Sequence, residues 1–201
     1  MTTQLNNISK NSALLVMDFQ EIILNNYLSK ESAEGVLRNT ASLISGARAV
    51  GVPVIYISVG FRKGYPEVSK NNTVFSTVKE YGIFINGSDG AAIHTDVAPT
   101  DDEPVIIKHR VGAFTFTDLE MVLRSQGIET LILTGITTSG VVLSTIRQAF
   151  DLDYRLVVAK DCCADPDDDS HLLLLDKIFT QHACVVLSSE IKKAWMEAQS
   201  K

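Results

Sequence analysis

An aspartate, a lysine and a glycine-containing turn each stand where an apolar segment of the chain ends. Asp18 closes the first apolar run, Lys108 closes a later one, and the turn from Gly135 to Val141 follows another. A carboxylate beside an ammonium group in a partly dry pocket forms an ion pair, and the lysine then holds the carboxylate ionised and oriented. The turn would direct backbone N–H groups and the positive end of a helix dipole at one spot, which suits an anion or a developing oxyanion.

Strands that alternate with helices must position these residues. Apolar runs predict strands at residues 12–18, 54–59, 105–108, 131–134, 156–159 and 184–187. Apolar periodicity and end signals predict helices at residues 32–50, 117–125, 138–150, 168–179 and 189–198, with Ser32 as the cap of the first. The alternation indicates a single doubly wound α/β domain over residues 1–201, with a six-stranded, mainly parallel sheet and helices on both faces in a Rossmann-like three-layer arrangement. Ligands of such sheets bind outside the carboxyl ends of the strands, so we expect Asp18, Lys108 and the turn on one rim.

The connection from Gly60 to Glu103 is unusually long. It spends about forty residues between two predicted strands and is rich in Gly, Pro, Asn and Asp. This length predicts a lid or binding insertion, with a short helix near residues 73–81. A disordered insertion is the alternative, and five aromatic side chains argue against it.

Composition excludes several classes of partner. The 201 residues carry a formal net charge of -6, which offers no footprint for nucleic acid or an anionic membrane. No apolar run reaches the ~18 residues that span a bilayer, and Met1–Lys10 lacks the pattern of a secretory signal, so we expect a cytoplasmic protein. The three cysteines show neither a disulfide framework nor metal-type spacing, and we interpret them as reduced.

No metal site is predicted. The four histidines are scattered, and His109 would point away from Lys108 across its strand. The acidic run Asp165–Asp169 lacks the spaced oxygens and the glycine of a calcium loop, and its acids suit the start of the following helix.

Three separated motifs resemble those of the isochorismatase-like hydrolases, the cysteine hydrolase superfamily. They are Asp18-x-Gln20, Lys108-x-Arg110-x-Gly112-Ala113-Phe114-x-x-Thr117-x-Leu119 and Gly135-Ile136-Thr137-Thr138, in a match that runs from about Ser12 to Leu187. The resemblance implies a small-molecule substrate, no cofactor, a homodimer or larger homo-oligomer, and a catalytic group of Asp18, Lys108 and a cysteine six residues after the turn glycine. It also implies a cis peptide between Ile136 and Thr137.

The sequence departs from this pattern at the nucleophile. Position 141 is valine, and Cys162 and Cys163 follow a different predicted strand. The resemblance implies a second chemistry without cysteine, the hydrolysis of a vinyl ether, in which the aspartate protonates the enol-ether carbon and water adds to the oxocarbenium ion. Such relatives usually carry glycine where this chain has Val141. The alternative is a non-catalytic ligand-binding or interaction protein that retains the fold without the nucleophile.

Acid catalysis by Asp18 depends on two opposing effects on its pKa. A neighbouring lysine lowers the pKa of the aspartate, whereas an acid must be protonated, so burial has to outweigh the ion pair or the substrate has to bring the proton. Thr138 or Ser139 could serve as nucleophile with Asp18 as base, but we interpret both hydroxyls as caps of the following helix.

The remaining candidate site residues are substrate contacts. Among the cationic side chains Arg62, Lys63 and Arg110, the last is the strongest candidate for binding a carboxylate, because guanidinium binds carboxylates bidentately and Arg110 belongs to a matching motif. The full set of predicted substrate contacts is Gln20, Arg110, Phe19, Phe84, Phe114, Thr137, Thr138, Ser139 and Val141.

Overall fold

The computed structural model of the chain describes Leu5, Ile8 and residues 11–199. Its centre is a six-stranded sheet in which every neighbouring pair is parallel, in the order β3-β2-β1-β4-β5-β6. The strands are β1 (Ser12–Met17), β2 (Val54–Val59), β3 (Val105–Lys108), β4 (Thr130–Ile136), β5 (Arg155–Ala164) and β6 (Cys184–Val186). This order confirms the doubly wound sheet, and the chain reverses direction across the sheet between β1 and β4.

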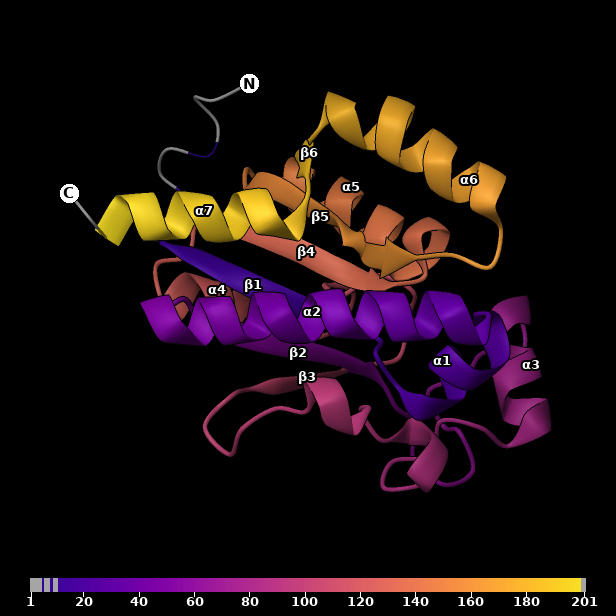
Figure 1. Cartoon of the computed structure of the whole chain (residues 1–201). Helices are drawn as coiled ribbons and strands as arrows, with labels where there is room; N and C mark the ends of the chain where they lie inside the picture. Colours follow the sequence, from indigo (N-terminus) through magenta and orange to yellow (C-terminus); the bar gives the residue numbers. More distant parts are fainter. Residues whose placement is uncertain (1–4, 6–7, 9–10, 200–201) are drawn as a thin grey trace.

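Helices cover both faces of the sheet (Figure 1). The α-helices are α1 (Glu21–Tyr27), α2 (Lys30–Val50), α3 (Thr73–Tyr81), α4 (Leu119–Ser125), α5 (Leu143–Asp151), α6 (Asp168–Leu173) and α7 (Ser188–Gln199). Short 3₁₀-helical segments are η1 (Asp89–Ala91), η2 (Thr95–Val97) and η5 (Phe179–Gln181), and short π-helical segments are η3 (Thr138–Val142) and η4 (Leu174–Ile178). Among the described residues, no helix is both long and apolar enough to cross a membrane.

Two apolar cores lie on opposite faces of the sheet. One contains side chains of α1, α2 and α7, including Leu43 and Trp195, and α2 and α7 run side by side in Figure 1. The other contains side chains of α4, α5 and η4, including Leu123 and Ile146. Successive side chains of a strand alternate between these cores, since β1 sends Leu14 and Val16 to the first core and Leu15 to the second. Both faces are therefore apolar, which explains the unbroken apolar runs of β1, β2 and β4.

The long connection between β2 and β3 is structured. It contains α3, η1 and η2, and its aromatic side chains Phe61, Tyr65, Phe75 and Phe84 are buried in the first core. The ring centroids of Phe61 and Phe75 lie 5.5 Å apart. The predicted short helix at residues 73–81 is confirmed, capped by Asn72, whose side chain accepts a hydrogen bond from the Phe75 N–H.

The observed helices and strands differ from the predicted ones in several details. The helix α1 was not predicted, β5 extends five residues beyond the expected end, and the predicted helix 168–179 divides into α6, η4 and η5. Ser29, and not Ser32, caps α2, because the Ser29 hydroxyl accepts a hydrogen bond from the Ser32 N–H. The expectation that Met1–Lys10 lacks a signal pattern falls mostly outside the described residues.

Candidate functional site

The carboxyl ends of β1, β3 and β4 bring the candidate residues to one end of the sheet. Met17, at the end of β1, pairs with Gly135 of β4, so Asp18 lies directly beside the turn that follows β4. Lys108 ends β3, in register with Val59 of β2. This edge is where parallel α/β sheets bind ligands, and the reversal between β1 and β4 places Asp18 at the switch point of the sheet.

Asp18 and Lys108 form a buried ion pair. The Lys108 Nζ lies 2.8 Å from Asp18 Oδ2, and their side chains are only 2% and 5% exposed, respectively. Lys108 also donates to the carbonyl oxygens of Arg110 and Val111, each at 3.1 Å. The three N–H donors of the ammonium group are thereby matched by three oxygens, which fixes the lysine in one orientation.

The second oxygen of the carboxylate, Asp18 Oδ1, is buried and has no hydrogen-bond partner among the described residues. Burial raises the pKa of Asp18 to about 6, although the charge and the hydrogen bond of Lys108 act in the opposite direction. Burial therefore outweighs the ion pair, and the pKa of Asp18 lies closer to neutral pH than that of an ordinary aspartate.

The backbone of Asp18 adopts an unusual conformation. Its φ angle is +61°, in the left-handed region that non-glycine residues rarely adopt, while its N–H donates to the carbonyl of Ile57 at 2.9 Å. Residues in such conformations cluster at functional sites, where the surrounding structure holds the strained backbone in place. The turn at Asp18 interrupts the path of β1 at the point where the carboxyl group meets Lys108.

The turn after β4 begins with a cis peptide between Ile136 and Thr137, as the resemblance implied. Thr137 is the residue that caps the following turn η3, because its hydroxyl accepts a hydrogen bond from the Gly140 N–H at 3.1 Å. A Cβ atom at Gly140 would lie 2.6 Å from that hydroxyl oxygen, so glycine is needed for the cap to form. The prediction that Thr138 and Ser139 are the capping residues is therefore wrong.

Thr138 and Ser139 instead contact the segment that follows β5. The Ser139 N–H donates to Asp165 Oδ2 at 2.7 Å, and the Thr138 hydroxyl lies 2.8 Å from Nδ1 of His171. One donor that we expected to face a ligand is therefore already occupied by a carboxylate of the chain itself. Asp165 and His171 were not predicted as partners of the turn, and the sequence signals this segment through the acidic run 165–169.

Gly135 allows β4 to approach β1 closely beside the site. A Cβ atom at this position would lie 3.1 Å from the Cβ and carbonyl oxygen of Met17 and 3.1 Å from a methyl group of Val142. Any larger residue would displace either the strand end that carries Asp18 or the start of the following helix.

Position 141, where the family resemblance implies a nucleophilic cysteine, holds valine, and no nearby thiol among the described residues takes over that role. The side chain of Val141 is 2% exposed and packs in the core that α4 and α5 cover. Cys163 of β5 pairs in register with Gly135, closer to the turn than its sequence position suggested. Burial raises the pKa of both Cys162 and Cys163, which disfavours the reactive thiolate at either position.

The remaining predicted contacts surround this site at different depths. Gln20 is fully buried, and its amide is shared among the main chain of β2 and η1: Nε2 donates to the carbonyls of Val59 and Ala91, and Oε1 accepts from the Val59 N–H. Arg110 is half-buried, and its guanidinium donates to the carbonyls of His109 and Glu67. Direct contact of either side chain with a substrate stays a prediction.

The three predicted aromatic contacts do not share one wall. Phe19 and Phe84 are buried in the core on the α2 face, whereas Phe114 packs against the core on the α5 face, with its ring 6.0 Å from that of Tyr154. Phe84 adopts a left-handed backbone, with φ at +61°.

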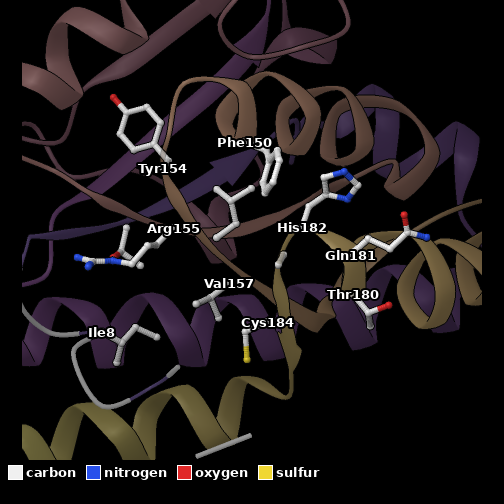
Figure 2. A pocket seen from close by; sticks show the side chains of 12 residues that line it. Ile8, Phe150, Tyr154, Arg155, Val157, Thr180, Gln181, His182 and Cys184 are labelled. Carbon is white, nitrogen blue, oxygen red and sulfur yellow. The ribbon is translucent and has the colours of Figure 1, made fainter. Parts of the chain in front are cut away.

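A cavity of about 560 Å³ lies at the opposite end of the strands, where their amino ends meet (Figure 2). It is bordered by the first residues of β4, β5 and β6, namely Thr130, Arg155 and Cys184. Its position at the amino ends of the strands separates it from Asp18, which lies at the carboxyl edge. Among the described residues, no group of three His, Cys, Asp or Glu side chains could hold a metal ion.

Comparisons with known proteins agree with this arrangement. Residues 12–191 match the model of the isochorismatase domain. The isochorismatase family protein YecD of Escherichia coli O157:H7 is 34% identical over 186 residues, which cover 92% of this chain and 97% of YecD. N-carbamoylsarcosine amidase of Arthrobacter is 32% identical over 141 residues, which cover 66% of this chain and 50% of the amidase.

A solved structure of similar length shares the fold. The isochorismatase family protein of Burkholderia thailandensis superimposes with a TM-score of 0.80 at 27% identity, over 92% of this chain and 96% of that protein. With the domain match over residues 12–191, these findings show that the chain belongs to the isochorismatase family of small-molecule hydrolases.

Proposed function

We propose that this protein hydrolyses a small organic molecule by adding water directly, with Asp18 as the proton donor and without a covalent enzyme intermediate. The observation that carries the proposal is the asymmetry of the Asp18 carboxyl group. Lys108 holds Oδ2, whereas Oδ1 is buried and meets no hydrogen-bond partner among the residues that the structure describes. The pKa of the group is raised to about 6. A carboxyl group in this state can carry a proton on Oδ1 and release it to a substrate near neutral pH.

A vinyl ether is the substrate class that this chemistry favours. The proton of Asp18 would pass to the terminal carbon of the C=C bond, and the π electrons would form the new C–H bond, which leaves an oxocarbenium ion. Water would add to the cationic carbon and return one proton to the Asp18 carboxylate. Collapse of the hemiketal would then give a ketone and an alcohol, so the reaction consumes one water and regenerates the acid. The protonation of carbon needs a carboxylic acid, and no step needs a thiol.

Val141 argues against the thioester route that the family resemblance implies for amide substrates. An amidase relative indicates that amide hydrolysis occurs within the family, but the position of the nucleophile holds a buried isopropyl group here. An amide substrate would therefore require direct attack by water, with Asp18 as the base.

Substrate binding is assigned to the turn and to Arg110. The turn from Thr137 to Val141 would hold the polar end of the substrate, and Arg110, whose guanidinium has no ion-pair partner among the described side chains, would bind a carboxylate. The buried position of Asp18 requires a segment of the chain to move before a substrate can reach it. We assign this movement to the insertion 60–103, as a lid of a single domain.

A second candidate is a non-catalytic protein that binds a ligand at the same rim. The burial of Asp18 and Lys108, which are 4% and 2% exposed, and the apolar residue at position 141 favour it. In that case the ion pair would serve the stability of the fold alone.

A panel of small vinyl ethers, amides and esters separates these functions. The parent chain and the Val141→Cys variant would be assayed side by side, with Val141→Ala as a control for the change in volume. We expect the parent chain to hydrolyse a vinyl ether. Activity that arises only in Val141→Cys, and on amides or esters, would contradict the proposal and support loss of function. Equal activity of Val141→Ala and Val141→Cys would show that space, and not the thiol, limits the reaction.

A further inference from the structure

The segment after β5 holds the turn after β4 through two side chains. Asp165 accepts the Ser139 N–H with Oδ2 and the Asp167 N–H with Oδ1, so its carboxylate bridges η3 and the start of α6. His171, on α6, reaches the Thr138 hydroxyl at 2.8 Å. Both contacts fall within the turn that lies beside Asp18.

The burial of Thr138 decides which partner donates in the second contact. Its side chain is fully buried, and among the described residues its hydroxyl has one hydrogen-bond partner, Nδ1 of His171. If Nδ1 carried the proton, the hydroxyl hydrogen would have no acceptor in an interior where an unpaired polar group is costly. The hydroxyl therefore donates to an unprotonated Nδ1, and the imidazole is neutral with its proton on Nε2.

We propose that neutral His171 is a positioning residue that holds the turn Thr137–Val141 in place through the Thr138 hydroxyl. Its consequence for catalysis rests on the function proposed above, whereas the contact itself does not. Protonation of His171 would convert Nδ1 from acceptor to donor and leave the hydroxyl hydrogen of Thr138 unpaired. The side-chain hydrogen bonds to Asp165 and to the Thr137 hydroxyl would then remain.

The charges around His171 set the pH at which this happens. Burial lowers the pKa of His171, while the carboxylates of Asp165, Asp168 and Asp176 oppose that effect. Asp165 directly follows β5, Asp168 lies in α6 and Asp176 in η4, and η3 contributes no charged residue. The pKa of His171 nevertheless lies below its usual value of 6.5, so the turn is held at neutral pH and released in acid. Release at low pH opposes the protonation of Asp18, which increases as the pH falls.

Two substitutions of His171 test the contact. His171→Phe keeps a ring of similar size but removes the acceptor, whereas the amide oxygen of His171→Asn can accept the Thr138 hydroxyl as Nδ1 does. His182→Phe is the matched control, since His182 lies at the other edge of the sheet and packs edge-on against Phe150. Amide hydrogen exchange of Ser139 and Gly140 is measured by NMR in the full chain at neutral pH, with the β1 amides as an internal check of the fold.

We expect exchange at Ser139 and Gly140 to be roughly tenfold faster in His171→Phe, and to stay within about threefold of the parent in His171→Asn and His182→Phe. In the parent, exchange in the turn, corrected for intrinsic rates, should accelerate as His171 takes up a proton below pH 6.5, and this dependence should vanish in His171→Asn. Unchanged exchange in His171→Phe would overturn the proposal. If His171→Phe fails to fold, a His171 Nδ1 that carries a proton at neutral pH in the ¹⁵N spectrum of the parent would overturn it equally. Neither readout depends on turnover, so failure of the proposed hydrolysis would be recognised separately.

Discussion

Lys108 Nζ lies 2.8 Å from Asp18 Oδ2, and the other oxygen of the same carboxyl group has no hydrogen-bond partner in the described part of the chain. The lysine orients the carboxyl group, while burial keeps its pKa near 6. The pair thus leaves one oxygen free to exchange a proton, and this single relationship connects the sheet topology to the proposed chemistry.

The stability of the fold should depend on pH through Asp18. The pKa of this group is raised in the folded state from 3.8 to about 6, so the folded protein binds the proton more tightly than the unfolded chain does. Its contribution to stability is complete below pH 4 and is lost as the pH rises through 6. We therefore compare the unfolding free energies of the parent and of Asp18→Asn. The difference, parent minus variant, should fall by an amount on the order of a few kcal/mol between pH 4 and pH 7. Urea unfolding at several pH values measures it.

Glu103 provides a control of opposite sign. Arg48 contributes to holding the pKa of this carboxylate below its ordinary value, so its contribution to stability is present at neutral pH and is lost in acid. The unfolding free energy of the parent minus that of Glu103→Gln should therefore rise with pH. A difference for Asp18→Asn that also rises with pH would contradict the raised pKa.

Removal of the lysine should raise the pKa of Asp18 further. In Lys108→Met, burial would act without the opposing positive charge, and the midpoint of the Asp18 carboxyl, followed by ¹³C NMR, should move up from about 6 by roughly 1 to 3 pH units. At pH 8 the variant should lose about 3 kcal/mol of unfolding free energy, because the buried carboxyl group must either stay charged without a partner or take up a proton. Lys30→Met, which removes an exposed ion pair with Glu34, should cost less than about 0.5 kcal/mol. A midpoint that stays in place or falls would show that Lys108 does not act on Asp18.

The close approach of β4 to β1 should make Gly135 sensitive to a single methyl group. Gly135→Ala would place its Cβ against Met17 and Val142, and we expect a loss of about 1 to 3 kcal/mol in unfolding free energy. Gly35→Ala is the matched control, because a Cβ at this position of α2 meets nothing within 4 Å and should stabilise the helix by about 0.5 to 1 kcal/mol. Equal effects of the two substitutions would contradict the crowding inferred at the turn.

The sequence allowed the sheet and the central pair to be predicted. Runs such as Leu131–Thr134 are apolar on both faces of the strand, which is typical of parallel sheets, and the strand-end rule then brought Asp18 and Lys108 to one edge. Local sequence patterns carry this information, because a strand that is buried on both faces needs apolar residues at successive positions.

The details of the turn could not be predicted in the same way. Three consecutive hydroxyl residues, Thr137, Thr138 and Ser139, are equally suited to cap a helix, and only the backbone decides that Thr137 does so. The contact between Thr138 and His171 joins residues 33 positions apart, with no periodic signal. The pKa of Asp18 depends on the depth of burial, which the type and order of residues do not specify.

Turnover by Asp18→Asn tests the central claim most directly. Asparagine keeps the shape of the side chain and removes the proton that Asp18 would donate, and loss of a general acid typically lowers the rate about 10²-fold to 10⁴-fold. On a vinyl ether that the parent hydrolyses, kcat of Asp18→Asn should fall by at least about 100-fold, while thermal unfolding at pH 7 remains cooperative. A kcat equal to that of the parent would contradict the proposed role of Asp18.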